Sequence, residues 1–429
     1  MTRAKPEPKR VVSPRALVWA RERAQLERAD VAEQLRRKTV DASTIASWER
    51  GDAQPTPAQR RDLAGILRIP ERWLFHKEPP TAFDDLGIVD FRTQDRRPLD
   101  TLSLNLRGAI EHALAVQAWV VDDRAHNDED PVPLVAARMD RESPKQVAEY
   151  LRRALRVEQV RADAKDADAF FNGLRRRLEE SGVLVLRMGQ VANKTRWSLD
   201  PTEFKGFTLI DEDRLAPLIF INRKDLDDAQ LFTLGHELAH LVTGGSGVSN
   251  EDIEDFDDDK PWIERFCDDV AEELLAPAEW FEQVWGAKRG LDEKRLNYVA
   301  SELKVSPLVA GRRAVSLGRA TPRAFHGFVA ASIERTAATK KPSGGNPYQS
   351  YPAWYGRELV RLLTSAATTD HPSGSDALEL LGVSYDVART LGERVAEKKA
   401  GTKQEPKELP RMKPVALVKL HDGWRTERR

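Results

Sequence analysis

The apolar positions of the first 80 residues recur every three to four places, a spacing that predicts short amphipathic helices. Gly51 is suited to end one helix, and Thr56-Pro57 to begin another. Short helices joined by tight turns are typical of a helix-turn-helix, whose second helix can enter the major groove of DNA. We therefore expect a five-helix domain over residues 1–80, with helices at 13–25, 30–37, 43–50, from Thr56 onward, and at 69–74.

The pattern changes after residue 85. Leu102, Leu106, Ile110, Leu114 and Ala118 repeat at a spacing of four, which indicates a long amphipathic helix. Further helices are expected at 146–155 and 166–180, and short apolar runs predict strands at 183–187, 206–210 and 218–221. The fold class is therefore α+β and mostly helical, with a small sheet.

The C-terminal part carries structural signals but no functional one. Residues 339–349 are rich in Lys, Pro, Gly, Ser and Asn, a composition typical of a linker. The predicted domains are 1–80, 85–335 (a helical part at 85–180 and a core at 181–320), a linker at 336–350, and a C-terminal helical unit at 351–429. Within that last unit we expect helices at 351–366 and 375–398, disorder in the charged stretch 398–413, and a strand at 415–420.

One short motif carries the chemistry: His236-Glu237-Leu238-Ala239-His240. Histidines at positions i and i+4 project from one face of a helix, so both imidazoles can bind one Zn²⁺. The glutamate between them is then placed as the general base, as in zinc peptidases. The alternative is a core helix with two unrelated histidines. Apolar flanks favour a buried helix, in which histidines need polar partners. The flanking apolar residues are Phe232, Leu234, Leu238, Leu241 and Val242.

A catalytic zinc takes three protein ligands and keeps one position open. The stretch from Trp262 to Pro277 reads as a second helix that Pro277 ends. Glu264 is the candidate third ligand, but acids also favour the first turn of any helix, and spacing alone does not separate the two readings. Asp268, one turn later, is predicted to accept a proton from a ligand histidine and so orient its ring.

The sequence here resembles the ImmA/IrrE family of bacterial metallopeptidases over roughly residues 85–320. In that family the glutamate that opens the second helix is the third zinc ligand, and this position is Glu264. Asp268 stands where the family often has Asn, and Ala276 where it often has Met. The segments that carry the resemblance are 203–211, 217–222, 232–240, 264–277 and 299–306.

The N-terminal domain resembles the XRE/Cro-like repressors through residues 45–51, followed by Pro55-Thr56. Residues 1–80 hold 17 Lys and Arg against 11 Asp and Glu, a mild positive surplus that favours DNA binding. A protein partner is the alternative, and Trp48 is expected in the core. We predict Ser43, Thr44 and Ser47 at base edges, and Arg36, Arg37, Lys38 and Arg50 at phosphates.

Composition limits the remaining possibilities. The 429 residues carry a net charge of −1, so any nucleic-acid surface is local. One cysteine, Cys267, excludes a disulfide framework; we expect it to be a small buried residue rather than a redox switch. No apolar run is long enough for a membrane span, and residues 1–10 lack the features of a signal peptide, so we expect a cytoplasmic protein, associated with the nucleoid when it binds DNA.

Together these features predict a DNA-binding zinc endopeptidase in which Glu237 is catalytic. The family resemblance implies cleavage of a transcriptional repressor, in a stress response or a mobile element. The small sheet suggests an extended peptide bound by strand addition, and a palindromic operator would suit a homodimer. The sequence does not identify the oxyanion stabiliser, for which Tyr298 and nearby arginines are no more than candidates. The acidic stretch 251–259 reads as a solvated loop; a lid over the cleft, or a calcium site without EF-hand spacing, is the alternative. The alternative is a non-proteolytic XRE-type regulator or toxin–antitoxin component, in which the zincin fold is a sensor or partner-binding module.

Overall fold

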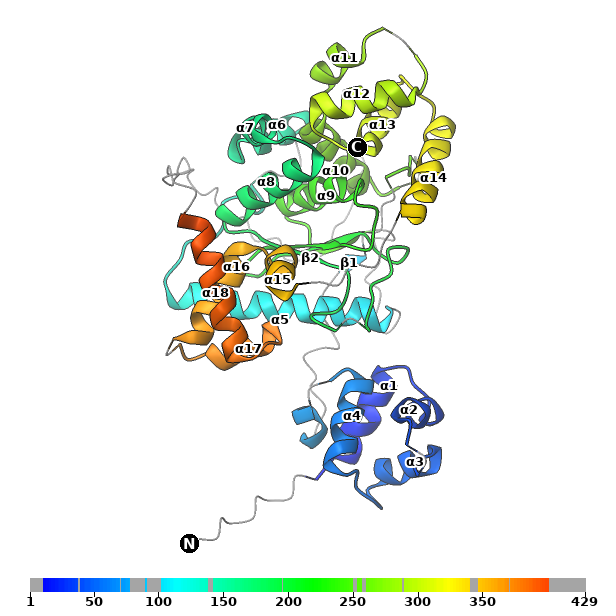
Figure 1. Cartoon of the computed structure of the whole chain (residues 1–429), viewed down its shortest axis with the longest axis vertical. Coiled ribbons are helices and arrows are strands. Elements are labelled where there is room, and N and C mark those ends of the chain that lie inside the picture. Colours follow the sequence, from blue (N-terminus) through cyan, green and yellow to red (C-terminus); the bar gives the residue numbers. More distant parts are fainter. Residues whose placement is uncertain are drawn as a thin grey trace, which may run out of the picture. The chain divides into compact units, whose positions relative to one another are not determined.

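The chain forms two compact units (Figure 1). One comprises residues 1–89 with 95–111, and the other comprises 90–94 with 112–429. The computed structural model describes residues 11–37, 39–69, 71–77, 89–90, 102–137, 142–194, 196–249, 253–256, 260–287, 289–339, 346–369 and 371–400.

The first unit is a set of short, well-capped helices around an apolar core. Ser13, Asp41 and Thr56 each accept a backbone hydrogen bond as N-caps, and Gly51 ends α3 in the left-handed region at φ 83°. Trp48 is buried in the core, as expected. The elements are α1 (Pro14–Arg23), α2 (Arg28–Leu35), α3 (Ala42–Arg50), α4 (Pro57–Leu67) and the 3-10 helix η1 (Glu71–Phe75), so the fifth predicted helix is a single tighter turn.

A buried ion pair ties three of these helices together. Glu49 on α3 accepts a hydrogen bond from Arg21 Nε of α1 at 2.5 Å and from Arg28 Nε of α2 at 2.7 Å. The Glu49 side chain is 3% exposed and that of Arg21 is 10% exposed. Because an unpaired buried charge is costly, this carboxylate fixes how α3 lies against α1 and α2.

The strands form a mixed sheet with the order β1-β5-β3-β4-β2, and β2, β3, β4 and β5 belong wholly to the second unit. Parallel pairing joins β2 to β4, and antiparallel pairing joins β3 to both β4 and β5. All five residues of β4 are buried, as expected for a central strand. The bounds are β1 (Val89–Asp90), β2 (Leu184–Met188), β3 (Gly206–Leu209), β4 (Leu218–Asn222) and β5 (Gly247–Ser249). The three predicted strands are confirmed, and the very short β1 and β5 were not predicted.

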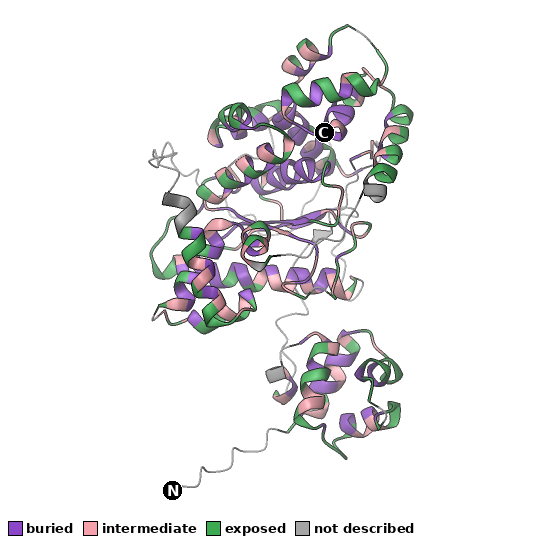
Figure 2. Cartoon of the chain, in the orientation of Figure 1, coloured by how far each residue is buried: buried purple, intermediate pink, exposed green. Residues whose placement is uncertain are grey.

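Helix α9 (Gln230–Thr243) packs on β3 and β4, and α10 (Trp262–Leu275) packs between α9 and α6 (Pro144–Ala154). The part of α5 (Leu104–His126) from His112 onward lies on the opposite face of the sheet (Figure 1). Burial is greatest along α9 (Figure 2). The other helices of this region are α7 (Val157–Asp163), α8 (Ala167–Glu180), α11 (Ala278–Trp285), α12 (Glu293–Leu303), α13 (Pro307–Ser316) and α14 (Pro322–Thr339). The α+β, mostly helical class is thus confirmed.

The C-terminal helices belong to the same compact unit as the sheet. Each of the two helices predicted there is in fact two, because a glycine with positive φ interrupts it: Gly356 at φ 84° and Gly382 at φ 64°. The predicted linker 336–350 is helical at both ends, because one helix extends to Thr339 and the next begins at Pro347. Residues 401–429, which include the strand expected at 415–420, lie outside the described part of the chain. The four helices are α15 (Pro347–Tyr355), α16 (Arg357–Thr368), α17 (Gly374–Leu381) and α18 (Tyr385–Ala400).

Candidate metal centre

The two motif histidines meet on the buried side of α9. His236 is 2% exposed and His240 is fully buried, and their Nε2 atoms lie 3.0 Å apart. Gly235 precedes them at the contact with α10, where an added Cβ would lie 3.3 Å from Ala271 Cβ. The absence of a side chain at Gly235 therefore lets α10 approach the histidines closely.

Glu264, in the first turn of α10, completes a three-residue cluster. Its Oε2 lies 3.0 Å from His236 Nε2, and its Oε1 lies 3.4 Å from His240 Nε2. The potential ligand atoms all fall within 4.8 Å of one another. Tetrahedral zinc with bonds of about 2.0–2.1 Å separates its ligand atoms by about 3.3 Å, so the spacing fits this ion.

Burial and hydrogen bonding also suit a metal here. Glu264 is fully buried, and its Oε1 has no hydrogen-bond partner, which is unusual for a buried carboxylate oxygen. Burial raises the pKa of Glu264, but the positive charge on His240 and a hydrogen bond from His236 outweigh that effect and lower it to about 2. The carboxylate is therefore ionised, the form that binds a cation.

Each histidine is oriented through its other ring nitrogen. His236 Nδ1 lies 2.9 Å from Asp268 Oδ1, and because a carboxylate only accepts, this nitrogen donates. Nε2 faces Glu264 Oε2 in the same way, so it would release its proton when it binds a metal. Cys267 Sγ lies 3.5 Å from His240 Nδ1. Burial raises the pKa of Cys267 well above its usual range, so the residue is a buried thiol, as expected.

Glu237 is held beneath the sheet, where β3 passes closely over it. Thr208 Oγ1 donates to Glu237 Oε2 at 2.8 Å, whereas Glu237 Oε1 has no hydrogen-bond partner. Burial raises the pKa of Glu237, although the histidine charges and the nearby hydroxyls of Thr208 and Ser249 oppose this effect. A raised pKa brings a carboxylate closer to the range in which it can accept and return a proton.

Gly206 on β3 makes this close approach possible. A Cβ on Gly206 would lie 2.9 Å from Glu237 Oε1 and 3.0 Å from the Phe220 carbonyl oxygen. These distances are shorter than a carbon atom tolerates, so position 206 has no room for a side chain.

A very small cavity of about 10 Å³ adjoins Glu237. Ser249 Oγ is buried there without a hydrogen-bond partner of ordinary geometry. The space is close to the minimum for one water molecule, and the oxygens of Glu237 and Ser249 are suited to bind that water. The cavity is lined by Lys205, Phe232, Thr233, His236, Glu237 and Ser249.

Sequence reasoning missed Thr208, Ser249 and Lys205, and it offered Tyr298 and nearby arginines only as candidates for the oxyanion stabiliser. Tyr298 is 58% exposed on α12, whereas Lys205 lines the cavity beside Glu237. The Lys205 ammonium is paired with Asp225 Oδ1 at 3.3 Å. The run Glu203-Phe204-Lys205-Gly206-Phe207 was the available signal, because it places a cation and a glycine at the start of a strand that precedes the motif helix.

The candidate DNA contacts lie at α2 and α3 of the first unit. Ser43 and Thr44 both donate to Asp41 Oδ1, at 2.7 and 2.8 Å, and Ser47 donates to the Thr44 carbonyl at 2.8 Å. The Ser43 hydrogen bond and those from Thr44 lower the pKa of Asp41 to about 2. The hydroxyls of Ser43 and Thr44 are therefore engaged at the N-cap of α3 and that of Ser47 within the helix, and Asp41 adds a negative charge at the helix start.

The predicted phosphate contacts have mixed surroundings. Arg36 is exposed at the end of α2, Arg37 pairs with Asp62 at 2.5 Å, and Arg50 pairs with Asp52 at 2.7 Å. Lys38 lies outside the described residues. Exposed pairs of this kind are weak, so these arginines can exchange a carboxylate for a phosphate.

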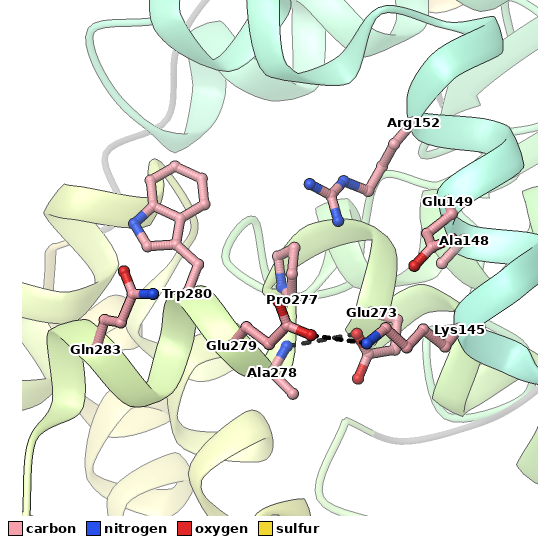
Figure 3. A pocket seen from close by; sticks show the side chains of 10 residues that line it. All are labelled: Lys145, Ala148, Glu149, Arg152, Glu273, Pro277, Ala278, Glu279, Trp280 and Gln283. Atoms are coloured by element: carbon pink, nitrogen blue, oxygen red, sulfur yellow. Dashed lines mark hydrogen bonds and ion pairs between the residues drawn. The ribbon is translucent and has the colours of Figure 1, made fainter.

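A larger pocket of about 210 Å³ lies between α6, the end of α10 and α11 (Figure 3). Lys145 pairs with Glu279 at 2.8 Å, and Arg152 pairs with Glu158 at 2.6 Å. Glu273 pairs with Arg313. Because these charges are already paired and none of the metal cluster lines the pocket, we assign it no role.

The α+β fold and the buried His236–His240–Glu264 cluster thus define a chain with an H-E-x-x-H-type candidate metal centre. Residues 179–315 match the family model Peptidase_M78, described as the IrrE N-terminal-like domain, so this segment is similar to metallopeptidase domains of the ImmA/IrrE kind. No curated protein matches the chain. Across the described residues, no helix has both the length and the apolar character that a membrane crossing requires.

Proposed function

We propose that the chain is a zinc-dependent endopeptidase with an N-terminal DNA-binding domain of the XRE kind. The observation that carries the proposal is the convergence of His236, His240 and Glu264, within 4.8 Å, beside a buried Glu237. A bound Zn²⁺ would supply Lewis acidity toward a water molecule and a peptide carbonyl.

The residues of the chain supply the remaining parts of the reaction. Glu237 Oε1, which has no partner, accepts the proton of the attacking water and returns it to the leaving amine. Thr208 holds the other oxygen of Glu237 and so fixes the direction of the free one. Lys205 is the cation beside this position that is suited to stabilise the developing oxyanion.

The substrate is proposed to be a transcriptional repressor or an antitoxin-like protein. The support is the similarity to ImmA/IrrE-type domains together with the basic, helical N-terminal unit. Binding by strand addition is restricted by the sheet order, because β3, which contacts Glu237, is an inner strand. The edge strands are β1 and β2, so an extended peptide could pair beside β5, whose Ser249 lines the cavity, only if β1 were displaced.

One observation favours the alternative of a non-proteolytic regulator. The cavity beside Glu237 holds about 10 Å³, and the three candidate ligands are at most 2% exposed, so a peptide needs the site to open. In that alternative the cluster binds zinc as a sensor or a structural element, and Glu237 does not act as a general base.

Two measurements separate these functions. Purified chain should contain about one zinc, and His236→Ala and Glu264→Ala should lose it. Glu237→Gln should keep both zinc and fold while repressor cleavage falls by at least about 100-fold, because the general base is gone. Wild-type protein without zinc contradicts the metal site, and undiminished cleavage by Glu237→Gln contradicts the peptidase.

A further inference from the structure

Behind His236 lies a buried network that the proposed reaction does not use. Asp268 Oδ1 accepts from His236 Nδ1, and Asp268 Oδ2 accepts from Arg312 Nη2 at 2.9 Å and from Lys260 Nζ at 3.1 Å. Asp268 is 4% exposed and Arg312 is 3% exposed. Burial raises the pKa of Asp268, but the charge of Arg312 and the His236 hydrogen bond outweigh that effect and lower it well below its usual range.

Arg312 comes from α13 and uses all three of its guanidinium nitrogens. Its Nε donates to Glu272 Oε1 at 2.9 Å, and its Nη1 donates to the carbonyls of Ile253 and Asp255 at 2.9 and 3.2 Å. The guanidinium also stacks on Phe232, with its carbon 4.5 Å from the ring centroid. A planar group held at this many points has one orientation, which lysine cannot reproduce.

These contacts connect three parts of the metal centre. Phe232 belongs to the motif helix α9, and Asp268 and Glu272 belong to α10. Ile253 and Asp255 belong to the acidic segment between the two helices, whose described residues 253–256 are held by Arg312 and Lys260. That segment was expected to be a solvated loop, yet Ile253 is buried.

We propose that Arg312 is a positioning residue for the metal ligand His236. It fixes Asp268 Oδ2, so that Oδ1 holds the His236 ring with Nε2 directed at the Glu264 carboxylate. Without Arg312, Asp268 would be a buried carboxylate left with Lys260 as its other cation, and it would turn away from His236. This inference rests on the proposed zinc site, and it adds a residue from a third helix to that site.

The neighbouring Arg313 provides a matched control. It is also buried, at 5% exposed, and it binds Glu272 Oε2 at 3.1 Å, the Ala276 carbonyl at 2.8 Å and Glu273. Its hydrogen bonds thus hold α10 but do not include Asp268. Losing either arginine removes one of the two cations that pair with Glu272, and only the loss of Arg312 also removes a cation from the aspartate that orients His236.

The test is the zinc affinity of the full-length chain, measured by competition with a chromogenic chelator. Arg312→Met should weaken zinc binding about 10- to 100-fold, as is usual when a partner of a ligand histidine is lost, whereas Arg313→Met should change it less than about threefold. Circular dichroism and the absorption spectrum of the Co²⁺-substituted protein report the fold and the ligand geometry. Equal losses in the two variants would reduce Arg312 to a general structural role and overturn the proposal.

An Asp268→Asn background tests whether Arg312 acts through Asp268. In that background Arg312→Met should weaken zinc binding by no more than about twofold, because the two changes interrupt the same contact. A full additional loss would overturn the proposal. If Arg312→Met does not fold, Arg312→Lys replaces it throughout, with an expected loss of about 10-fold. Wild-type protein without zinc would instead refute the proposed function, so the two failures are distinguishable.

Discussion

At the scale of single residues, the candidate site depends on a glycine as much as on its ligands. Gly206→Ala should place a methyl group against Glu237 and the Phe220 carbonyl, both of which are buried. Overpacking of this kind costs about 1–3 kcal/mol of unfolding free energy. Glu237 should also shift, so cleavage should fall even at temperatures where the variant is folded.

Chemical denaturation of the second unit measures the stability part of this prediction. Gly327→Ala on α14 is the control, because a Cβ there meets no atom within 4 Å. Alanine in a helix interior is favoured over glycine by up to about 1 kcal/mol, so this variant should be neutral or slightly more stable. A Gly206→Ala protein as stable as Gly327→Ala would contradict the close packing of β3 on Glu237.

Residues that belong to one helix are the part of the site that the sequence predicts well. His236 and His240 lie one turn apart, as do Glu264 and Asp268, so helical spacing alone groups each pair. Thr208 is 29 residues from Glu237, and Arg312 is 44 residues from Asp268. No periodicity connects positions that only the tertiary fold brings together, which is why both were missed.

At the scale of elements, the helices of the first unit depend on Glu49. Glu49→Ala removes the carboxylate that pairs with Arg21 and Arg28, and it leaves Arg21 buried without that partner. Breaking a buried pair costs about 3–5 kcal/mol, so α1, α2 and α3 should open together more readily. Amide hydrogen exchange of these helices in the full-length chain measures the change.

The exposed pair Arg50–Asp52 provides the comparison within the same unit. The two side chains are 63% and 59% exposed, so Asp52→Ala should cost no more than about 1 kcal/mol. Similar exchange rates in Glu49→Ala and Asp52→Ala would show that the buried pair does not organise the three helices.

Element boundaries were predictable wherever local chemistry sets them. Ser143, Ser306 and Thr56 cap the starts of α6, α13 and α4, and Gly51 ends α3.

The helix break at Gly356 was not predicted. A side chain at Gly356 would lie 2.2 Å from Glu179 Oε1 on α8, so a distant contact explains this glycine. The short strand β5 was missed because three residues are too few to show alternation.

At the scale of the whole molecule, a buried histidine makes stability depend on pH. His112 Nε2 lies 2.8 Å from Tyr355 Oη, and the Tyr355 hydroxyl donates to the Leu380 carbonyl at 3.1 Å. Because a phenol has one proton to donate, the imidazole is the donor to Tyr355. Burial lowers the pKa of His112 to about 4.

The sign of the pH dependence follows from that lowered pKa. Unfolded chains protonate histidine near pH 6.5, so between pH about 6.5 and 4 the unfolded state holds the extra proton. The unfolding free energy should therefore decrease as pH falls through this window, by about 3 kcal/mol in total, and His112→Gln should remove that slope. Thermal melts at a series of pH values measure it, with His126→Gln at an exposed position of α5 as the control. An unchanged slope in His112→Gln would exclude His112 as its source.

The contacts of Arg175 have a consequence for how the protein is made. This arginine of α8 donates to the Val185 carbonyl of β2 and, across a separation of 178 residues, to the Ala353 carbonyl of α15. Ribosomes add about 5–20 residues each second, so roughly 10–40 s pass between the synthesis of β2 and that of α15, the helix that packs on it. During that interval a nascent chain exposes the apolar flank of its sheet, and a chaperone has time to bind there before the last helices leave the ribosome.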